Sequence, residues 1–226
     1  MFPFSTPMPT DAGRDPHLRA STSLRNRLAR AVWGVVWLLL CRHSPRPMHA
    51  WRALVLKAFG ARLGRHSHVY PGASIWAPWN LHCEDAVGIA DGAVIYNPKP
   101  VHLGSHCVIS QQAYLCGAGH DIDDPAFPMV SQPIRIGAYA WVCARATVCP
   151  GVTVGEGAVL GLGGVATTDL QAWTVYAGVP ARALRQRRRH GGIAVVAPTA
   201  GAPAAADGPA LSTPAVSPVT PHASLG

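Results

Sequence analysis

The sequence has few charged residues, and their positions are uneven. Only 13% of the 226 residues are charged, and 19 Lys and Arg residues against 11 acids give a formal net charge of +8. The stretch from Leu103 to Asp169 holds two Arg and no Lys, whereas eight Arg lie between Arg14 and Arg52 and five between Arg182 and Arg189. Aromatic residues are not interleaved with these basic flanks, and no helix-turn-helix or zinc-finger spacing occurs. Nucleic acid is therefore not an expected partner.

Two further absences concern redox chemistry and membranes. The six cysteines include no CxxC pair, and no secretory signal with a cleavage site is evident, so we expect reduced thiols in a cytoplasmic protein. The apolar run from Ala31 to Cys41 has eleven residues, whereas a membrane-spanning helix needs roughly 20. Transmembrane anchoring by this run is therefore excluded.

What the sequence does have is a short repeat. From residue 136 onward an aliphatic residue occurs every six positions, and a small residue follows each one four places later. The aliphatic positions are Ile136, Val142, Val148, Val154 and Leu160. A period of six fits neither a helix, with a period near 3.6, nor a flat strand, with a period of 2. It fits a parallel β-helix of hexapeptide repeats, in which each six residues form one short strand and one corner of a prism.

The repeat begins near Leu63 and is interrupted for twenty residues between Leu115 and Ile136. So long an interruption predicts a loop extruded from the solenoid wall, and such loops often carry function. We place the β-helix at residues 61–175 and the extruded loop at 117–133.

The flanking segments have other compositions. Residues 1–22 are rich in Pro, Thr, Asp and Gly, and residues 191–226 in Ala, Pro, Gly, Ser and Thr, so we expect a disordered leader and a disordered tail. Residues 23–60 are expected to form helices, interrupted by the prolines of the segment 44–47. The Arg-rich segment 176–190 is expected to contain a short helix.

The first of these helices has two possible roles. Its run from Ala31 to Cys41 contains Trp33 and Trp37 and follows three arginines. Such a helix can pack against the end of the coil, or it can lie in a membrane interface. Both interpretations stay open from the sequence.

Several segments, together with the hexads, resemble the hexapeptide-repeat acyltransferases. They are SPRPMHAWR at 44–52, IYN at 95–97, CVISQQAYLC at 107–116, HDIDDPAFP at 120–128, PGVTVGEGAVLG at 150–161 and WTVYAGVPAR at 173–182. Within that superfamily the chain resembles the acetyltransferases of colanic acid and exopolysaccharide biosynthesis, relatives of the maltose and galactoside acetyltransferases. The resemblance implies an all-β solenoid, a left-handed parallel β-helix with N-terminal helices and a short C-terminal helix, and a homotrimer.

The resemblance also implies acceptor-site residues. His120 aligns with the catalytic histidine, which would remove the proton from an attacking hydroxyl, because an alcohol is a poor nucleophile while it holds that proton. Asp121, Asp123 and Asp124 are candidates to orient the imidazole or bind sugar hydroxyls, with turn formation as the alternative. Asn97 matches, loosely, a sugar-contacting asparagine, and a plain turn residue is the alternative.

Coenzyme A would lie along a groove between neighbouring coils. The resemblance places its contacts at Trp141, Ala144, Gly161, Leu162 and Thr167, with Arg182 and Arg185 at the nucleotide phosphates. Many relatives have Thr-Lys where this chain has Thr167-Thr168, so a phosphate-facing lysine is missing. No metal is expected, because the histidine spacing differs from that of the zinc-binding relatives.

The sequence thus predicts an O-acetyltransferase that uses acetyl-CoA to modify a saccharide or lipid-linked saccharide in exopolysaccharide or colanic-acid-like biosynthesis. It would act in the cytoplasm, at the inner face of the membrane if residues 31–41 make peripheral contact. The alternative is a non-catalytic hexapeptide-repeat scaffold or an acyl-nucleotide-binding protein.

Overall fold

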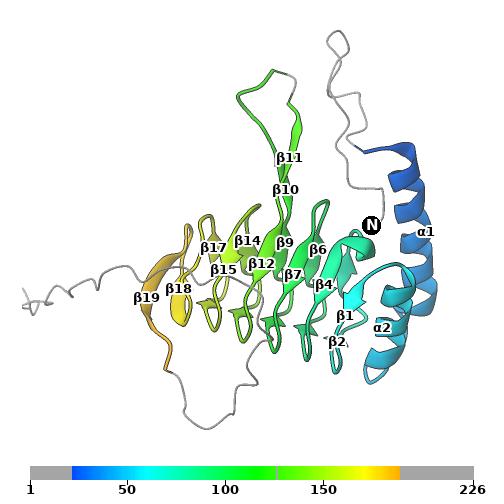
Figure 1. Ribbon diagram of the computed structural model, residues 1–226, viewed down its shortest axis with the longest axis horizontal. Coiled ribbons are helices and arrows are strands. Elements are labelled where there is room, and N and C mark those ends of the chain that lie inside the picture. Colours follow the sequence, from blue (N-terminus) through cyan, green and yellow to red (C-terminus); the bar gives the residue numbers. More distant parts are fainter. Residues whose placement is uncertain (1–21, 126, 189–226) are drawn as a thin grey trace, which may run out of the picture. The chain divides into compact units, whose positions relative to one another are not determined.

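The computed structural model describes residues 22–125 and 127–188, so the predicted tail and nearly all of the predicted leader lie outside the described residues. The described residues belong to one compact unit. They form a β-solenoid preceded by two helices (Figure 1). The predicted left-handed β-helix is confirmed, with about six turns.

Each of the first five turns contributes one short strand to each of three parallel sheets, and β18 and the antiparallel β19 extend one of them. Sheet A consists of β1 (Arg62–Leu63), β4 (Leu81–Cys83), β7 (Val101–Leu103), β12 (Ile134–Ile136) and β15 (Thr153–Val154). Sheet B consists of β2 (His68–Val69), β5 (Gly88–Ile89), β8 (Val108–Ile109), β13 (Trp141–Val142), β16 (Val159–Leu160), β18 (Thr174–Ala177) and β19 (Arg182–Gln186). Sheet C consists of β3 (Ser74–Ile75), β6 (Val94–Tyr96), β9 (Tyr114–Cys116), β14 (Thr147–Val148) and β17 (Val165–Ala166). A short 3-10 helix, η2 (Pro78–Asn80), precedes β4.

The hexad residues fill the interior of the prism, as predicted. Val142, Val148, Val154 and Leu160 are completely buried, and Ile136 is 2% exposed. The small residues four places later are buried as well, so one apolar core runs through the coils. Burial of apolar surface along this continuous core is the main source of stability for such a repeat fold.

The glycines after the aliphatic positions are required by the stacking of the coils. A Cβ atom on Gly137 would lie 2.5 Å from the backbone nitrogen of Glu156, and one on Gly155 would lie 2.5 Å from that of Ala172. Real Cβ atoms do not approach backbone so closely. Glycine therefore lets the backbone of one coil touch the next.

Helices α1 (Leu24–Leu40) and α2 (His49–Ala58) cover the first coil (Figure 1). Ser23 caps α1 by accepting a hydrogen bond from the Asn26 backbone N–H. Trp33 and Trp37 are buried against the coil, and Trp33 Nε1 donates to the carbonyl of Ile75 in β3 at 2.7 Å. The packing role predicted for this helix is thus present on its tryptophan face.

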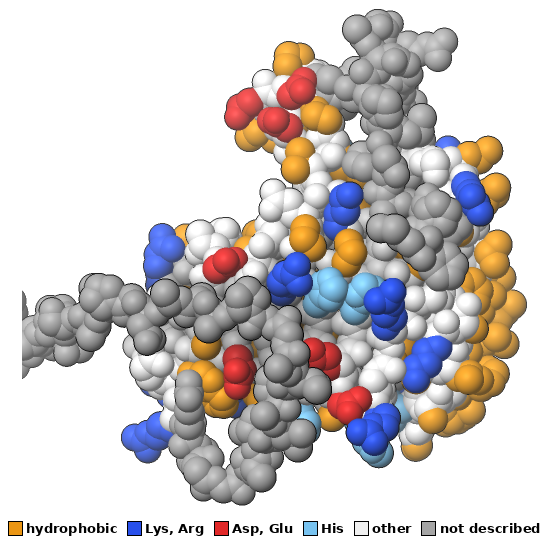
Figure 2. Space-filling view, viewed as in Figure 1, with side chains coloured by type: hydrophobic (Ala, Val, Ile, Leu, Met, Phe, Trp, Pro, Cys, Tyr) orange, Lys and Arg blue, Asp and Glu red, His pale blue; other side chains and the backbone are white. Residues whose placement is uncertain are grey.

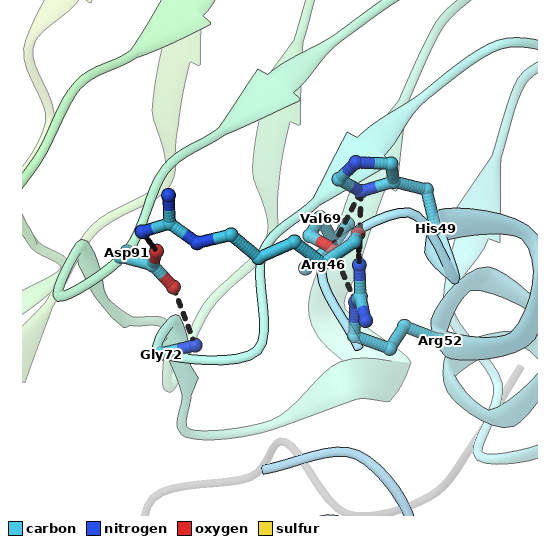
Figure 3. Close-up of polar contacts among 6 residues, drawn as sticks. All are labelled: Arg46, His49, Arg52, Val69, Gly72 and Asp91. Carbon is cyan, nitrogen blue, oxygen red and sulfur yellow. Dashed lines mark hydrogen bonds and ion pairs between the residues drawn. The ribbon is translucent and has the colours of Figure 1, made fainter. Parts of the chain in front are cut away.

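Arg52 of α2 joins the helices to the solenoid. Its side chain is completely buried and donates to the carbonyls of Val69 and Arg46 (Figure 3). It also donates to the carbonyl of Pro45 and to the hydroxyl of Ser44. These acceptors belong to the first coil and to the proline segment between the helices. The contacts explain the arginine of the segment 44–52, and burial lowers the pKa of this guanidinium.

The C-terminal end differs from the expectation. The helix predicted within 176–190 is wrong, because Arg182–Gln186 forms strand β19, which pairs antiparallel with β18. Among the described residues no further coil follows β18, so the N–H and C=O groups along its free edge need hydrogen-bond partners. A returning strand pairs with those groups, whereas a helix uses its backbone groups internally.

The interruption of the repeat is a hairpin. Strands β10 (Ala118–His120) and β11 (Met129–Ser131) pair antiparallel, in the segment predicted as the extruded loop. Figure 1 shows the hairpin projecting from the wall between β9 and β12. Because β9 belongs to sheet C and β12 to sheet A, the hairpin leaves the prism at the corner between these two sheets, here called the C–A corner.

Candidate functional site

His120 lies on the extruded hairpin and is held by one residue. Its ring stacks on the Phe127 ring with centroids 4.3 Å apart and an interplanar angle of 8°. Its Nδ1 lies 2.9 Å from the Phe127 carbonyl oxygen. A carbonyl oxygen can only accept, so this contact requires the hydrogen on Nδ1 and leaves the Nε2 lone pair available to a substrate proton.

The three aspartates near His120 are exposed, and the partner that orients the imidazole is the Phe127 carbonyl. Asp121 Oδ1 accepts from the backbone N–H of Asp123 at 3.1 Å, which is the turn-forming role named as the alternative. Asp123 and Asp124 lie in the same exposed turn. The sequence did not predict the role of Phe127, because the contact is made by its backbone carbonyl, a group that every residue has.

The sugar-contacting role predicted for Asn97 is not supported by the structure, which gives this residue a structural role. Its side chain is completely buried. The amide oxygen accepts from the backbone N–H of Ala77 at 2.9 Å, and the amide nitrogen donates to the Ala77 carbonyl at 2.8 Å. Asn97 therefore ties two adjacent coils together and has no surface to offer a sugar in this chain.

Four predicted cofactor residues meet at the B–C corner, the edge where sheet B turns into sheet C. Trp141 is 46% exposed on β13, and its Nε1 donates to Ser110 Oγ at 2.8 Å. Ala144 and Leu162 lie at this corner in successive coils, which are joined by a hydrogen bond from the Gly163 N–H to the Ala144 carbonyl at 3.1 Å. Leu162 is 74% exposed.

Gly161 completes that group, and Arg182 lies beside it. A Cβ atom on Gly161 would meet the Tyr176 carbonyl at 3.0 Å and the Ala177 side chain at 3.2 Å, so glycine keeps this part of the corner shallow. Ala177 is the register partner of Arg182, which places that arginine next to the corner. Arg185 lies further along β19, exposed, with Nη1 donating to the Gln186 carbonyl at 3.1 Å.

Other predicted residues lie elsewhere. Thr167 and Thr168 are exposed beyond the end of β17, at the far edge of sheet C from the B–C corner. His120 belongs to the C–A corner, on that same far side. Within one chain, therefore, the predicted base and the Trp141 group lie at different edges of the prism. In the described part of the chain no three His, Cys, Asp or Glu side chains are grouped to hold a metal ion.

Comparisons with known proteins give a consistent picture of the fold. No protein-family model matches the sequence. The chain is 34% identical over 117 residues to the putative colanic acid biosynthesis acetyltransferase WcaF of Escherichia coli, and equally to that of Shigella flexneri. The match covers 52% of this chain and 64% of each relative, so the chain spans slightly less than two thirds of the relatives that it matches.

Solved structures are similar over a larger share. A hexapeptide-repeat acetyltransferase of Vibrio cholerae O1 biovar eltor, determined with acetyl coenzyme A, has 24% identity and a TM-score of 0.67 over 74% of this chain and 91% of that one. A galactoside acetyltransferase in complex with coenzyme A has 24% identity and a TM-score of 0.68 over 75% of this chain and 86% of that one. These likenesses show that the chain has the left-handed β-helix fold of the hexapeptide-repeat acetyltransferases.

Proposed function

We propose that this protein is an O-acetyltransferase that moves an acetyl group from acetyl-CoA to a saccharide hydroxyl in exopolysaccharide or colanic-acid-like biosynthesis. The observation that carries the proposal is His120, an exposed imidazole on the extruded hairpin with Nδ1 fixed by the Phe127 carbonyl. The similarity to the colanic acid relatives supports the substrate class, and the likeness to structures determined with acetyl coenzyme A or coenzyme A supports the donor.

The reaction follows from that tautomer. Nε2 accepts the hydroxyl proton while the oxygen attacks the thioester carbonyl carbon, and a tetrahedral intermediate forms. Its collapse breaks the carbon–sulfur bond and gives the acetyl ester and coenzyme A thiolate, which takes the proton from the imidazolium. The Phe127 carbonyl stabilises the imidazolium through the Nδ1 hydrogen bond throughout.

Acetyl-CoA would bind along the B–C corner. Trp141, Ala144, Gly161 and Leu162 would line the pantetheine arm, and Arg182 and Arg185 are available to the phosphates. Guanidinium groups suit phosphate geometry, which would compensate for the lysine that Thr168 replaces.

The active unit would be a homotrimer, since the base and the Trp141 group lie at different edges of one prism. The outward-facing positions of the coil strands, β2 to β18 in sheet B and β3 to β17 in sheet C, contain no Lys, Arg, Asp or Glu. Charge enters only with Arg182 and Arg185 of β19 at the C-terminal end of sheet B, so most of either face can be buried against another copy without desolvating a charge. Light scattering should give three times the chain mass, and Val94→Glu on sheet C should lower it. A fully active monomer would contradict this arrangement.

Peripheral membrane contact is proposed for α1, at the cytoplasmic face. Seven large apolar side chains of α1 are between 46% and 71% exposed, and Figure 2 shows hydrophobic side chains along this edge. They are Leu24, Leu28, Val32, Val35, Leu38, Leu39 and Leu40. No helix among the described residues is long and apolar enough to cross a membrane. The acceptor could then be a lipid-linked saccharide presented at the bilayer surface.

Vesicle flotation tests the membrane contact. The wild-type protein should float with vesicles of phosphatidylglycerol and phosphatidylcholine, whereas a Val32→Ser, Val35→Ser and Leu39→Ser triple variant should not. Leu184→Ser, which changes an apolar side chain that is 65% exposed on β19, should float like the wild type. Failure of the wild type to float would refute the contact.

The proposed activity is tested by thiol release from acetyl-CoA against a panel of sugars, nucleotide sugars and oligosaccharides. His120→Ala should abolish acceptor-dependent release, and His43→Ala, which changes an exposed turn histidine, should not. If no acceptor supports release and acetyl-CoA does not bind, the scaffold alternative is the better description.

A further inference from the structure

Sheet A carries a row of basic side chains on its outer face. The register of the sheet places Arg62 opposite His82, His82 opposite His102, and His102 opposite Arg135. Each of these residues precedes an inward-facing residue of β1, β4, β7 or β12, so their side chains point outward. We call these four residues the sheet A basic row. Figure 2 shows His side chains flanked by Lys and Arg on this face.

The four groups are closely and regularly spaced. Neighbouring strands lie about 4.8 Å apart, so the row extends over about 14 Å. The rings of His82 and His102 meet edge to face, with centroids 4.7 Å apart. The row is therefore a continuous line of hydrogen-bond donors across four coils.

Nearby carboxylates do not neutralise the row. Glu84 accepts from the backbone and hydroxyl of Ser105, and Asp85 binds Arg65. Neither Arg62 nor Arg135 has an ion pair with an acid in the part of the chain that the structure describes. Partial burial and the neighbouring cations lower the pKa values of His82 and His102. The site thus repels additional positive charge and would be stabilised by an anion.

The other two sheets differ from sheet A in this respect. The outward positions of their coil strands hold no Lys, Arg, Asp or Glu, and the only arginines, Arg182 and Arg185 of β19, lie at the C-terminal end of sheet B in the described part of the chain. If copies of the chain associate through those faces, sheet A remains exposed to solvent. A cationic row across four coils of the exposed face, opposite coil strands that carry no charge on the other two faces, is the pattern expected for a ligand surface.

We propose that the sheet A basic row binds an acidic saccharide, a chain whose sugars carry carboxylate or phosphate groups. Arg62 and Arg135 would hold two anionic groups at the ends of the row, and the two histidines would donate to the groups between them. One sugar of an extended chain is about as long as one strand spacing, so successive sugars can follow successive coils. Nucleic acid fits less well, because the edge-to-face rings of His82 and His102 offer no flat platform for base stacking.

Binding to the row is a property separate from catalysis. That the bound saccharide is the acetyl acceptor rests on the proposed function. The sheet A basic row would then select acidic saccharides and hold them along the coils. Another sugar of the same saccharide would reach His120 on the hairpin.

Fluorescence anisotropy with labelled hexagalacturonate tests the binding, without acetyl-CoA, so its outcome does not depend on transferase activity. The wild-type protein should bind this probe and not labelled maltohexaose, which is neutral. Arg62→Gln with Arg135→Gln should weaken binding by about tenfold or more, because two charge-assisted contacts are lost. The control is Arg65→Gln with Arg145→Gln, which removes the same charge from residues paired with Asp85 and Gln112. The control should bind within about twofold of the wild type.

Three results would overturn the proposal. Equal losses in the two double variants would mean that only net charge matters. Competition by oligothymidylate as effective as that by unlabelled hexagalacturonate would mean that the row has no saccharide preference. A change in the mass of the Arg62→Gln, Arg135→Gln variant by light scattering would mean that sheet A is a contact between copies.

A second measurement concerns the histidines. The groups that face them are Arg62, Arg135 and each other's rings. Binding should tighten as pH falls from about 7.5 to 5.5, because both imidazoles gain protons near an anion. His82→Gln with His102→Gln should remove this pH dependence, and its persistence in that variant would count against the row.

Discussion

Replacing Arg52 should loosen the N-terminal helices from the solenoid. The side chain is completely buried and donates to Val69 O at 2.6 Å and to Arg46 O (Figure 3). It also donates to Ser44 Oγ at 2.8 Å and to Pro45 O at 2.9 Å. Arg52→Met keeps much of the volume but removes every guanidinium donor. Val69 O would keep only its contact with His49 Nδ1 and Pro45 O only the Met48 N–H. A hydrogen bond from a charged group contributes about 1.5–3 kcal/mol, and several such bonds from one buried guanidinium are lost, so we expect a loss of about 3–5 kcal/mol.

The assay should be local as well as global, because a repeat fold can lose one end without unfolding throughout. Urea unfolding followed by tryptophan fluorescence reports mainly on the N-terminal helices and first coil, which hold five of the seven tryptophans. Hydrogen exchange should show faster exchange in α1, α2 and the first coil, and unchanged exchange in the coils after β12.

The matched control is Arg46→Met in the same proline segment. Arg46 Nη2 lies 2.6 Å from Asp91 Oδ2, but its side chain is 73% exposed. Such surface ion pairs contribute about 0–1 kcal/mol. If Arg52→Met cost no more than Arg46→Met, the buried hydrogen-bond network would not hold the helices, and the reasoning would be refuted.

Three further predictions concern stability. Because the pKa values of His82 and His102 are lower in the folded state, the unfolded state binds more protons, and stability should fall as pH drops below about 6.5. Urea midpoints at pH 7.5 and 5.5 measure this loss, and His102→Gln should reduce the difference between them. Gly137→Ala should destabilise the protein by about 2 kcal/mol or more in thermal unfolding, because its Cβ atom would overlap the next coil. Gly34→Ala in α1, where a Cβ atom meets open space, should be neutral or stabilise by up to about 1 kcal/mol. Asn97→Ala should lower the free energy of unfolding by about 1–3 kcal/mol and leave the KM for the acceptor unchanged in steady-state kinetics. A raised KM at unchanged stability would instead support the sugar-binding role.

The sequence alone was sufficient where a structural feature depends on one side chain and on its position within the six-residue repeat. The hexads predicted the solenoid, because burial of an aliphatic residue at each sixth position depends only on that period. The break between Leu115 and Ile136 predicted the extruded segment that carries His120. Both inferences needed no knowledge of which coil lies beside which.

Pairing between distant residues could not be predicted in the same way. Asn97 precedes a proline and suggested a turn, but stacking places it against Ala77, twenty residues earlier, where its amide is fully used. The Arg-rich end suggested a helix, but the open edge of β18 favours a strand. The orientation of His120 depends on a backbone carbonyl across the hairpin.

The sheet A basic row shows the same division. The six-residue period by itself places Leu63 and Ile136 inward, and hence the preceding Arg62 and Arg135 outward. The outward positions of His82 and His102 were read from the structure. Only the tertiary structure decided that they lie side by side, because the hairpin inserted after β9 changes the spacing along the chain while the coils keep their register. Side-chain direction follows from the two-residue period of a strand, whereas lateral neighbours follow from hydrogen bonds between strands far apart in sequence.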